Sequence, residues 1–374
     1  MKLAFPQSVG RIAFREGRTM SITAETLGYT QGGEEIRRYR LTNRNGYEAS
    51  FTNLGAIWTG LVMPDRNGNK ADVLLGYDTA EGLMELSGEM GAIVGRNANR
   101  IKDAEFKLNG ITYRLAKNNG PNNLHSGPDK FSKRIFRAEP KSVDSADELH
   151  FFLHSPEGDQ GFPGTLEAEI IYTFTDDNAL TIAYKLTAGT QDTVANFTSH
   201  PYFNLAGHAS GSARGQLLWI DADQFCESDQ NTCTTGRLLR VDSTPFDFRT
   251  PKALGRDLET DTEQLRFCGG YDHNFCLKHE QGKTALSATA FDEASGRFME
   301  VFTDRPGLQL YSGNFLDPEV TAKEGAHYHR YDGYAFEAQF YPNAINVPEW
   351  EQPVVKAGTT QESATTYRFS VRGE

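Results

Sequence analysis

The sequence has few cysteines and no long apolar run. Its 374 residues include only 4 cysteines. None of them has the Cys-x-x-Cys spacing of a metal motif; they are Cys226, Cys233, Cys268 and Cys276. The first residues contain no apolar stretch of the kind that forms a secretion signal, and no segment has the length of a membrane-spanning helix. We therefore expect free thiols in a cytoplasmic protein, with a removed export signal as the open alternative.

Positive charge is scarce as well. Lys and Arg total 38 against 50 Asp and Glu, which gives a net charge of -12 at pH 7. Nucleic acids, anionic membranes and polyphosphates are bound through basic surfaces, so this balance argues against all three as partners. Linkers rich in proline or serine, blocks of like charge and internal repeats are absent too, and long helical periodicity is largely missing. Nothing in the sequence divides the chain or predicts a helical bundle.

The sequence does contain aromatic residues, at 11%, and 36 glycines, with short alternating segments between turns. The clearest segment is residues 106–115, which alternate on both sides of Asn109-Gly110, a strong hairpin signal. Further candidate strands are residues 36–41, 47–51, 57–63, 149–153, 166–174, 180–186, 217–220, 285–291, 298–303, 308–311, 334–340 and 366–371. We predict an all-β fold, one large antiparallel β-sandwich. Residues 35–374 form its single domain in this prediction, and residues 1–34 are an N-terminal extension or its first strands.

Two segments concentrate residues suited to proton transfer. His200 lies among strand-like and aromatic residues, where a histidine is more often a packed core residue than a catalyst. In residues 334–340, alternation places Glu337 and Gln339 on the face opposite the aromatic side chains. That face is either the lining of a polar cleft or the solvent side of an edge strand. Together, Glu337 and His200 have the residue types of a base and an acid that act on one substrate.

Seven short motifs occur in order along the chain. They are Gly-Arg-x-Ala-Asn-Arg-Ile at 95–101, Asn-Leu-His at 123–125, His-x-Tyr-Phe-Asn-Leu-Ala-Gly at 200–207, Thr-Pro-Phe-Asp-Phe-Arg at 244–249, Gly-Tyr-Asp-His-Asn-Phe at 270–275, Gln-x-Tyr-x-Gly-Asn-Phe-Leu-Asp at 309–317 and Glu-x-Gln at 337–339. Each motif alone is short and weakly specific. As an ordered set covering about residues 35–371, they resemble the aldose 1-epimerase family.

The resemblance implies the β-supersandwich fold of that family and the interconversion of α and β anomers of free hexoses such as glucose and galactose. It implies that Glu337 takes the proton from the C1 hydroxyl and that His200 protonates the ring oxygen, so that the ring opens and recloses on the other face. Positions that match sugar-binding residues of the family are Asn99, Arg100, His125, Tyr202, Asp272 and Gln309, with Arg96 as a weaker candidate in the same loop. Ring opening by acid and base needs no cofactor.

The chemistry requires an ionised base and a protonated acid at the same pH. We expect a nearby carboxylate, Asp272, to favour the imidazolium form of His200, because an opposite charge stabilises the charged form. This hypothesis predicts a bell-shaped pH dependence of turnover.

The loop after His125 departs from the family pattern. Ser126-Gly127 stands where the family usually has Gly-Gly, and Phe136 stands where it has Trp. These changes leave the expected acid and base in place, but they leave the preferred sugar open.

Three other functions stay open on the sequence. A glycoside hydrolase needs two carboxylates, which Glu337 and Asp272 would supply. A non-catalytic sugar-binding module would keep the hydroxyl-binding residues without any need for the Glu–His pair. A hexose-6-phosphate 1-epimerase would need a cationic phosphate pocket, for which Arg96 and Arg100 are the available arginines. The two arginines belong to the motif matched to sugar contact, so we favour an unphosphorylated hexose.

Histidine pairs raise the question of a metal. His327 and His329 lie two residues apart, and His150 and His154 lie on one face of a predicted strand. Neither pair has a third ligand of obvious spacing, so we predict no metal site. For assembly we expect a monomer or a homodimer.

Overall fold

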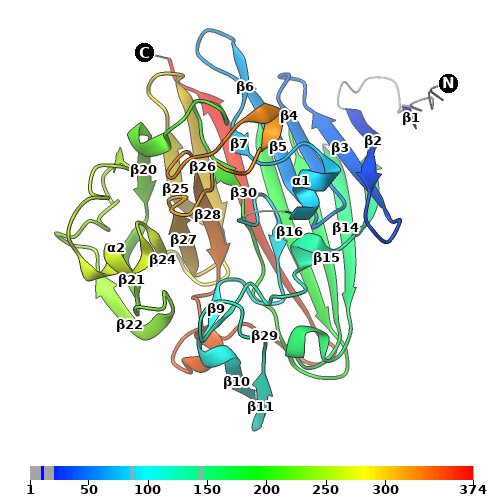
Figure 1. Ribbon diagram of the computed structural model, residues 1–374, viewed down its shortest axis with the longest axis vertical. Coiled ribbons are helices and arrows are strands. Elements are labelled where there is room, and N and C mark those ends of the chain that lie inside the picture. Colours follow the sequence, from blue (N-terminus) through cyan, green and yellow to red (C-terminus); the bar gives the residue numbers. More distant parts are fainter. Residues whose placement is uncertain (1–9, 12–20, 86–87, 143–145, 374) are drawn as a thin grey trace.

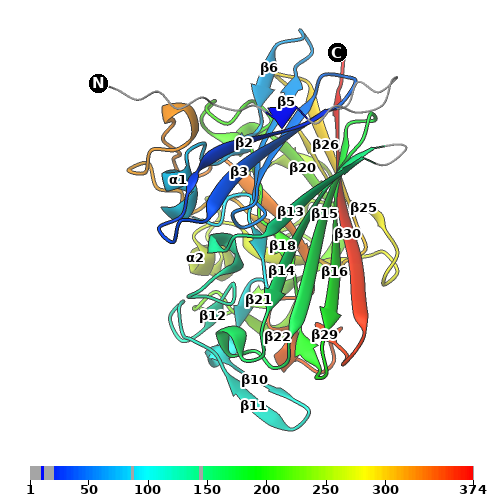
Figure 2. The same cartoon turned by 90° about the vertical axis from the view of Figure 1, so that its right-hand side faces the viewer.

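The computed structural model describes residues 10–11, 21–85, 88–142 and 146–373. Strands dominate this part of the chain, in three large sheets of 6, 9 and 7 strands and four two-stranded sheets. Neighbouring strands pair antiparallel in the large sheets, and the sheets enclose a common interior (Figures 1 and 2). The prediction of an all-β antiparallel sandwich is confirmed.

The largest sheet has nine strands in the order β13-β14-β15-β16-β30-β26-β25-β20-β23. Their bounds are Arg137–Ser142 (β13), Asp147–Ser155 (β14), Leu166–Phe174 (β15), Ala179–Ala188 (β16), Thr360–Val371 (β30), Arg297–Thr303 (β26), Ala285–Phe291 (β25), Leu217–Ile220 (β20) and Lys252–Ala253 (β23). Apolar and polar residues alternate along these strands, which is the pattern of a sheet with one buried face. In β16, for example, Ile182, Tyr184 and Leu186 are buried while Lys185 is exposed.

A seven-stranded sheet carries the residues of functional interest, in the order β22-β21-β24-β27-β28-β19-β7. Its strands are Thr234–Arg240 (β22), Ala222–Ser228 (β21), Asp272–Leu277 (β24), Gly307–Tyr311 (β27), Tyr334–Gln339 (β28), Tyr202–Phe203 (β19) and Leu74–Leu75 (β7). The last three strands in this order, β28, β19 and β7, are far apart in the sequence. β19 lies between the other two and pairs with both. This order brings the segment after His200 beside the strand that holds Glu337.

The six-stranded sheet contains the beginning of the described chain. Its strands are Gly10–Arg11 (β1), Ser21–Tyr29 (β2), Glu35–Thr42 (β3), Glu48–Thr52 (β4), Trp58–Pro64 (β5) and Lys70–Asp72 (β6). β2 pairs with β3 along nearly its whole length, and Ile22 reaches the core. Residues 1–9 and 12–20 lie outside the described residues, and the domain boundary at residue 35 stays a prediction.

Short elements connect the large sheets. The two-stranded sheets pair Glu105–Leu108 (β10) with Ile111–Arg114 (β11), Arg100–Ile101 (β9) with Asn123–Leu124 (β12), Ile93–Val94 (β8) with Thr198–Ser199 (β18), and Thr193–Val194 (β17) with Val354–Val355 (β29). The α-helices are Ala80–Glu85 (α1) and Glu263–Cys268 (α2), and the 3-10 turns are Lys102–Ala104 (η1), Phe131–Lys133 (η2), Asp159–Gly161 (η3), Ala213–Gly215 (η4), Lys323–Gly325 (η5) and Ala344–Asn346 (η6). The β10–β11 hairpin projects from one end of the molecule in both ribbon views. None of the helices in the described ranges has the length and apolar character needed to cross a bilayer.

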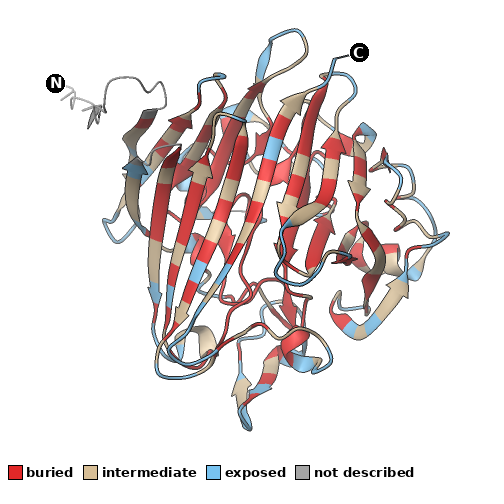
Figure 3. Ribbon diagram, turned by 180° about the vertical axis from the view of Figure 1, so that it is seen from behind, coloured by how far each residue is buried: buried red, intermediate tan, exposed pale blue. Residues whose placement is uncertain are grey.

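One hydrophobic core joins the three large sheets. The ring of Trp58 in β5 lies 5.8 Å from that of Phe203 in β19 and 5.4 Å from that of Tyr367 in β30, between centroids. The hydroxyl of Tyr367 donates a hydrogen bond of 3.0 Å to the carbonyl of Phe336 in β28. Figure 3 shows buried residues running along the strands around this interior. Because interiors of this kind are close-packed, the core fixes the position of β28 and β19 relative to each other.

β28 is an internal strand, with β27 on one side and β19 on the other. Its aromatic residues Tyr334 and Phe336 belong to the core, as alternation predicts. The opposite face is buried too, with Glu337 2% and Gln339 0% exposed. The interpretation of this face as the solvent side of an edge strand is therefore wrong.

Candidate active site

The loops before β9 and after β12 hold two of the predicted site residues against each other. Leu124 of β12 pairs with Arg100 of β9, which places Asn99 beside His125. The His125 amide donates to the Asn99 carbonyl at 3.0 Å, and the Asn99 amide donates to His125 Nδ1 at 3.2 Å. Asn99 and His125 have positive φ angles of 59° and 53°. Such backbone strain in non-glycine residues gathers at functional sites, where it aims side chains that regular strands would turn away.

Strand pairing places the other predicted residues on neighbouring strands. Gln309 of β27 lies opposite Glu337 of β28, and Asp272 of β24 lies opposite Tyr311 of β27. On the other side of β28, Tyr202 pairs with Ala335. His200, two residues before Tyr202, thereby reaches the side chain of Glu337 although it is distant in sequence.

These side chains surround a pocket of about 300 Å³. Its lining includes seven of the predicted site residues together with seven that were not predicted as site residues: Asn99, Arg100, His125, His200, Tyr202, Asp272 and Glu337 stand with Gly88, Glu89, Asn119, Leu124, Lys130, Tyr311 and Phe315. Half of these fourteen residues are buried, whereas Phe315 is 70% exposed. The volume is at the lower end of the range for small-molecule sites, and the lining is rich in hydrogen-bonding groups, which suits a small polar ligand.

His200 and Glu337 form the centre of this pocket. Nε2 of His200 lies 3.4 Å from Oε1 of Glu337, and their side chains are 6% and 3% exposed. The imidazole stacks on the ring of Tyr202, with centroids 4.9 Å apart and planes 16° from parallel. The Tyr202 hydroxyl is in turn held by the Gly88 carbonyl at 2.9 Å. Within the described residues, Nδ1 of His200 and Oε2 of Glu337 have no hydrogen-bond partner, so a polar ligand would satisfy them.

Burial sets the protonation of this pair. Loss of water lowers the pKa of His200 to about 4, against the opposing charges of Glu89 and Asp272. The same loss of water, with the charge of Asp272, raises the pKa of Glu337 well above its usual value. Between these pKa values the pair holds one proton, on Glu337. Asp272 does raise the pKa of His200, as expected, but desolvation outweighs the attraction of that carboxylate and leaves the imidazole neutral at neutral pH.

Arg100, Asp272 and Gln309 form a connected group beside Glu337. Arg100 Nη1 lies 3.4 Å from Asp272 Oδ2, and its Nε donates to Asn119 Oδ1 at 2.9 Å. Gln309 Nε2 donates to Asp272 Oδ1 at 2.6 Å. Gln309 is 2% exposed and lies opposite Glu337 on the neighbouring strand. Its hydrogen bond orients the Asp272 carboxylate, and the expected contact of Gln309 with a sugar stays a prediction.

Arg96 also lies away from the pocket. It is fully buried, and each of its guanidinium nitrogens is hydrogen-bonded: Nε to the Ser155 hydroxyl, Nη1 to the Pro163 and Gly164 carbonyls and the Thr193 hydroxyl, and Nη2 to the Ser155 and Pro156 carbonyls. Burial lowers its pKa to about 10, which leaves it charged at neutral pH. The expectation that Arg96 contacts the sugar is wrong, because all its donors are taken by the loops that it joins.

We expect Arg96→Met to lower the free energy of unfolding by about 3–5 kcal/mol, the range for removing one partner from a buried charged network. Carbonyls that now accept from the guanidinium would stay buried without donors. Thermal or urea unfolding measures the change. Arg114→Met is the control, since the Arg114 side chain is 78% exposed and forms a surface ion pair of 3.0 Å with Glu105. A stable Arg96→Met protein with a raised KM would contradict the structural role.

The motifs gave no signal for Glu89 and Lys130. Glu89 follows a glycine in a segment without recognisable pattern, and Lys130 lies in the loop that departs from the family motif. In the structure, Lys130 Nζ lies 2.6 Å from Glu89 Oε1, in the wall of the pocket. The departure of the loop after His125 from the family pattern was the sequence feature that indicated a difference near Lys130. It did not identify Glu89 as the partner of Lys130.

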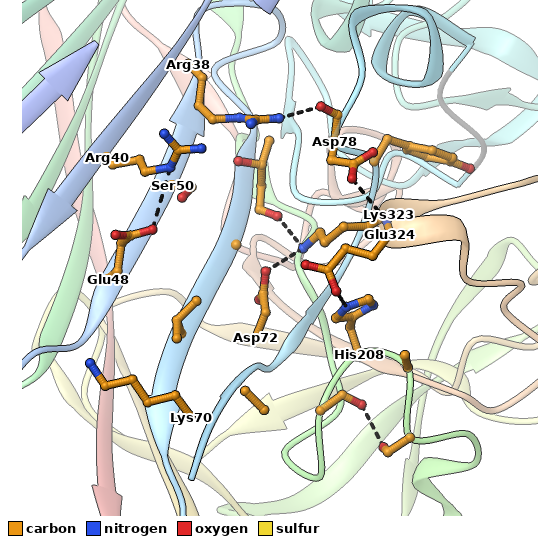
Figure 4. A pocket seen from close by; sticks show the side chains of 18 of the residues that line it. Arg38, Arg40, Glu48, Ser50, Lys70, Asp72, Asp78, His208, Lys323 and Glu324 are labelled. Atoms are coloured by element: carbon orange, nitrogen blue, oxygen red, sulfur yellow. Dashed lines mark hydrogen bonds and ion pairs between the residues drawn. The ribbon is translucent and has the colours of Figure 1, made fainter. Parts of the chain in front are cut away.

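A larger cavity of about 680 Å³ lies between β4–β6, the loop around His208 and η5 (Figure 4). Lys323 in its wall is ion-paired: Lys323 Nζ lies 2.8 Å from Asp72 Oδ2 and donates to the Thr59 carbonyl at 2.7 Å. His208 Nε2 lies 3.3 Å from Glu324, but Glu324 is 73% exposed, so water screens this pair. A buried acid and base meet in the smaller pocket instead.

Three side chains of the pocket also have metal-ligand chemistry. Among the described residues, the one cluster of three close ligand groups is His125, His200 and Glu337, within 4.8 Å of one another. Because Nδ1 of His125 accepts from the Asn99 amide, the neutral ring carries its proton on Nε2. An N–H donor suits a sugar oxygen better than a metal. The pairs His327–His329 and His150–His154 belong to no such cluster in the described ranges.

Comparison with known proteins gives a consistent result. The sequence profile described as aldose 1-epimerase matches residues 37–368. The galactose mutarotase of Bos taurus is 37% identical over 353 residues, which cover 94% of this chain and 99% of that protein. The aldose 1-epimerase of Escherichia coli is 35% identical and covers 92% of this chain and 98% of that protein. The crystal structure of an aldose epimerase homologue from C. elegans has a TM-score of 0.81 at 30% identity, with 89% of this chain and 98% of that chain covered.

Proposed function

This chain belongs to the aldose 1-epimerase family, and from that premise we propose that Glu337 and His200 are the base and the acid of its reaction. The activity of the protein is the interconversion of the α and β anomers of a free aldose. The observation that carries the assignment is the 3.4 Å contact between His200 Nε2 and Glu337 Oε1 in a buried pocket. Anomer interconversion needs one group that accepts a proton and one that donates a proton within reach of the same sugar.

The reaction then follows from one proton shared by the pair. Transfer of that proton from Glu337 to His200 produces a carboxylate and an imidazolium. Glu337 takes the proton of the C1 hydroxyl, the C1–O5 bond breaks, and His200 gives its proton to O5. Rotation about C1–C2 exposes the other face of the aldehyde, and the reverse transfers close the ring. Each positioned proton transfer contributes about 10²–10⁴-fold in rate.

The remaining pocket residues hold the sugar in this proposal. His125 presents an N–H, Asn99 a side-chain amide, and Arg100 and Asp272 a fixed pair of donor and acceptor. These groups match the alternating donor and acceptor character of adjacent hydroxyls. Tyr202 orients the imidazole of His200 by stacking, and its position beside the pocket keeps it a candidate sugar contact.

Asp272 is poorly placed to serve a glycoside hydrolase. A hydrolase needs a second carboxyl that is free to act as acid, base or nucleophile. Asp272 is instead bound by Arg100 and by Gln309. A non-catalytic sugar-binding module is equally disfavoured, since it would have no use for a buried Glu–His pair whose desolvation is costly.

The protein should accelerate the loss of optical rotation of freshly dissolved α-glucose or α-galactose and leave aryl glycosides intact. Glucose 6-phosphate should react with a kcat/KM lower by about tenfold or more, because both cations among the described residues of the pocket lining are already paired with carboxylates. Arg100 is paired with Asp272, and Lys130 with Glu89. Polarimetry of the free and phosphorylated sugars measures the difference.

Two results would contradict this substrate class. Release of the aryl alcohol would indicate a hydrolase, and equal or faster reaction of glucose 6-phosphate would indicate a sugar-phosphate epimerase. Heat-inactivated protein and free imidazole at matched pH are the controls, since imidazole catalyses the reaction slowly without a pocket.

We further propose a cytoplasmic enzyme, monomeric or homodimeric, that acts on free sugar without nucleic acid or membrane partners. The four cysteines are free and buried, which supports a reducing compartment. The net charge of -12 supports the exclusion of polyanionic partners.

A further inference from the structure

The wall of the catalytic pocket contains an ion pair that the proposed reaction does not use. Lys130 Nζ lies 2.6 Å from Glu89 Oε1, with the two side chains 23% and 9% exposed. Neither group is needed to take a proton from O1 or to protonate O5. A charged pair held this far out of water is expensive to maintain, so its place beside the acid calls for a physical role.

The backbone fixes Glu89 to the segment of His200. The Gly91 amide donates to the His200 carbonyl at 2.8 Å, and the His200 amide donates to the Ala92 carbonyl at 3.0 Å. Gly91 has φ of 74°, and a Cβ there would lie 2.1 Å from the Trp58 carbonyl oxygen, so only glycine permits this approach. Glu89, at φ 58°, is thus held two residues from a backbone contact of the catalytic histidine.

Several charged or titratable groups face His200, and they come from different elements. They are Glu89 and Lys130 from the two loops, His125 after β12, Tyr202 of β19, Asp272 of β24, Tyr311 of β27 and Glu337 of β28, with Arg100 of β9 in the same pocket. Asp272 is neutralised by Arg100. Glu89 raises the pKa of His200 more than Asp272 does, and Lys130 lowers it.

We propose that the Glu89–Lys130 pair sets the proton balance between His200 and Glu337: Glu89 favours the imidazolium, and Lys130 restrains this effect. The inference rests on the proposed roles of His200 and Glu337. Glu89 and Lys130 are positioning residues, because they act through His200 and not on the sugar. Their charges affect the His200 end of the pocket, whereas the pKa of Glu337 responds to Asp272 and Arg100.

The proposal makes the two partners act in opposite directions. With one proton in the pair, the reactive fraction is the form with a proton on His200 and a carboxylate at Glu337. A lower affinity of His200 for the proton decreases that fraction by the same factor. It also moves the acid limb of the kcat profile, where His200 binds the second proton, to lower pH. A higher affinity increases the fraction and moves the limb to higher pH.

The experiment measures kcat and KM for α-glucose from acid to neutral pH in Glu89→Gln, Lys130→Met and the double variant. Glu89→Gln should lower kcat by about tenfold and move the acid limb down by about one pH unit, the effect of one nearby opposite charge. Lys130→Met should move the acid limb to higher pH, by a smaller amount than Glu89→Gln moves it to lower pH. The shift is smaller because Glu89 without its partner binds a proton more readily and so loses part of its charge. The acid limb of the double variant should lie between those of the two single variants. Lys130→Arg keeps the positive charge and should have the native profile.

Lys356→Met is the matched control, since Lys356 forms an ion pair of 2.9 Å with Asp192 outside the pocket. Shifts of the acid limb in the same direction for both single variants, or no shift, would overturn the proposal. A rise in KM alone would overturn it too, because that result indicates direct sugar contact. These outcomes leave the proposed function intact, which fails instead if His200 or Glu337 proves dispensable.

Discussion

Replacing Glu337 by Gln should lower kcat for mutarotation by about 10²–10⁴-fold, the contribution of one positioned general base. The amide keeps the size and hydrogen-bonding shape of the carboxyl but cannot take the proton of the C1 hydroxyl. Because Glu337 is buried on an internal strand, water is a poor substitute for the lost base. KM should change little, since the sugar hydroxyls keep their partners. Polarimetry on α-glucose and α-galactose measures both constants.

The pH dependence of the residual activity identifies which group remains. In Glu337→Gln, His200 acts alone as the acid and must be protonated, so residual activity should fall as the pH rises above the His200 pKa of about 4. Glu362→Gln is the control, since Glu362 is exposed on β30. Wild-type turnover in Glu337→Gln would show that Glu337 is not the base.

Replacing His200 by Asn should also lower kcat by about 10²–10⁴-fold, the contribution of one positioned general acid. Its residual activity should have the opposite slope. Glu337 alone remains and must be ionised, so activity should rise as the pH increases through the Glu337 pKa, which burial raises. The fall in activity near pH 4 that marks the second proton on the native pair should disappear.

A double variant separates a shared mechanism from two independent contributions. Groups that act as one unit are non-additive, so Glu337→Gln with His200→Asn should cost little more than either change alone. His154→Asn is the control for the histidine, since His154 is exposed and bonded to Glu167 on the nine-stranded sheet. Multiplicative losses in the double variant would contradict a proton shared between the two side chains.

Local patterns in the sequence determined the fold class and the identity of the two central residues. Alternation of side chains depends on neighbours along one strand, so it placed Tyr334 and Phe336 in the core and Glu337 on the opposite face without tertiary information. The Asn109-Gly110 turn similarly predicted the β10–β11 hairpin from adjacent residues. The ordered motifs led to the family because they carry the residue types that its chemistry needs.

The tertiary structure alone decided which polar residues line the pocket. Arg96 and Arg100 belong to one motif, yet the first is enclosed by carbonyls of distant loops and the second reaches the pocket. Gln309 donates to the Asp272 carboxylate because β24 and β27 are neighbours. Sequence gives no measure of such burial, since the enclosing atoms come from segments far along the chain.

The protonation of His200 and Glu337 was also decided by the tertiary structure. The sequence contains Asp272, which attracts a charged His200, but not the depth at which His200 is buried, and burial has the larger effect on its pKa. Glu89 and Lys130 likewise form a pair only because one loop lies over the other. The sequence by itself determined the strands, the family and the two residues that we propose as acid and base. Folding determined the distance between these residues, the position of their proton and their neighbours, because desolvation and long-range contacts exist only in the packed chain.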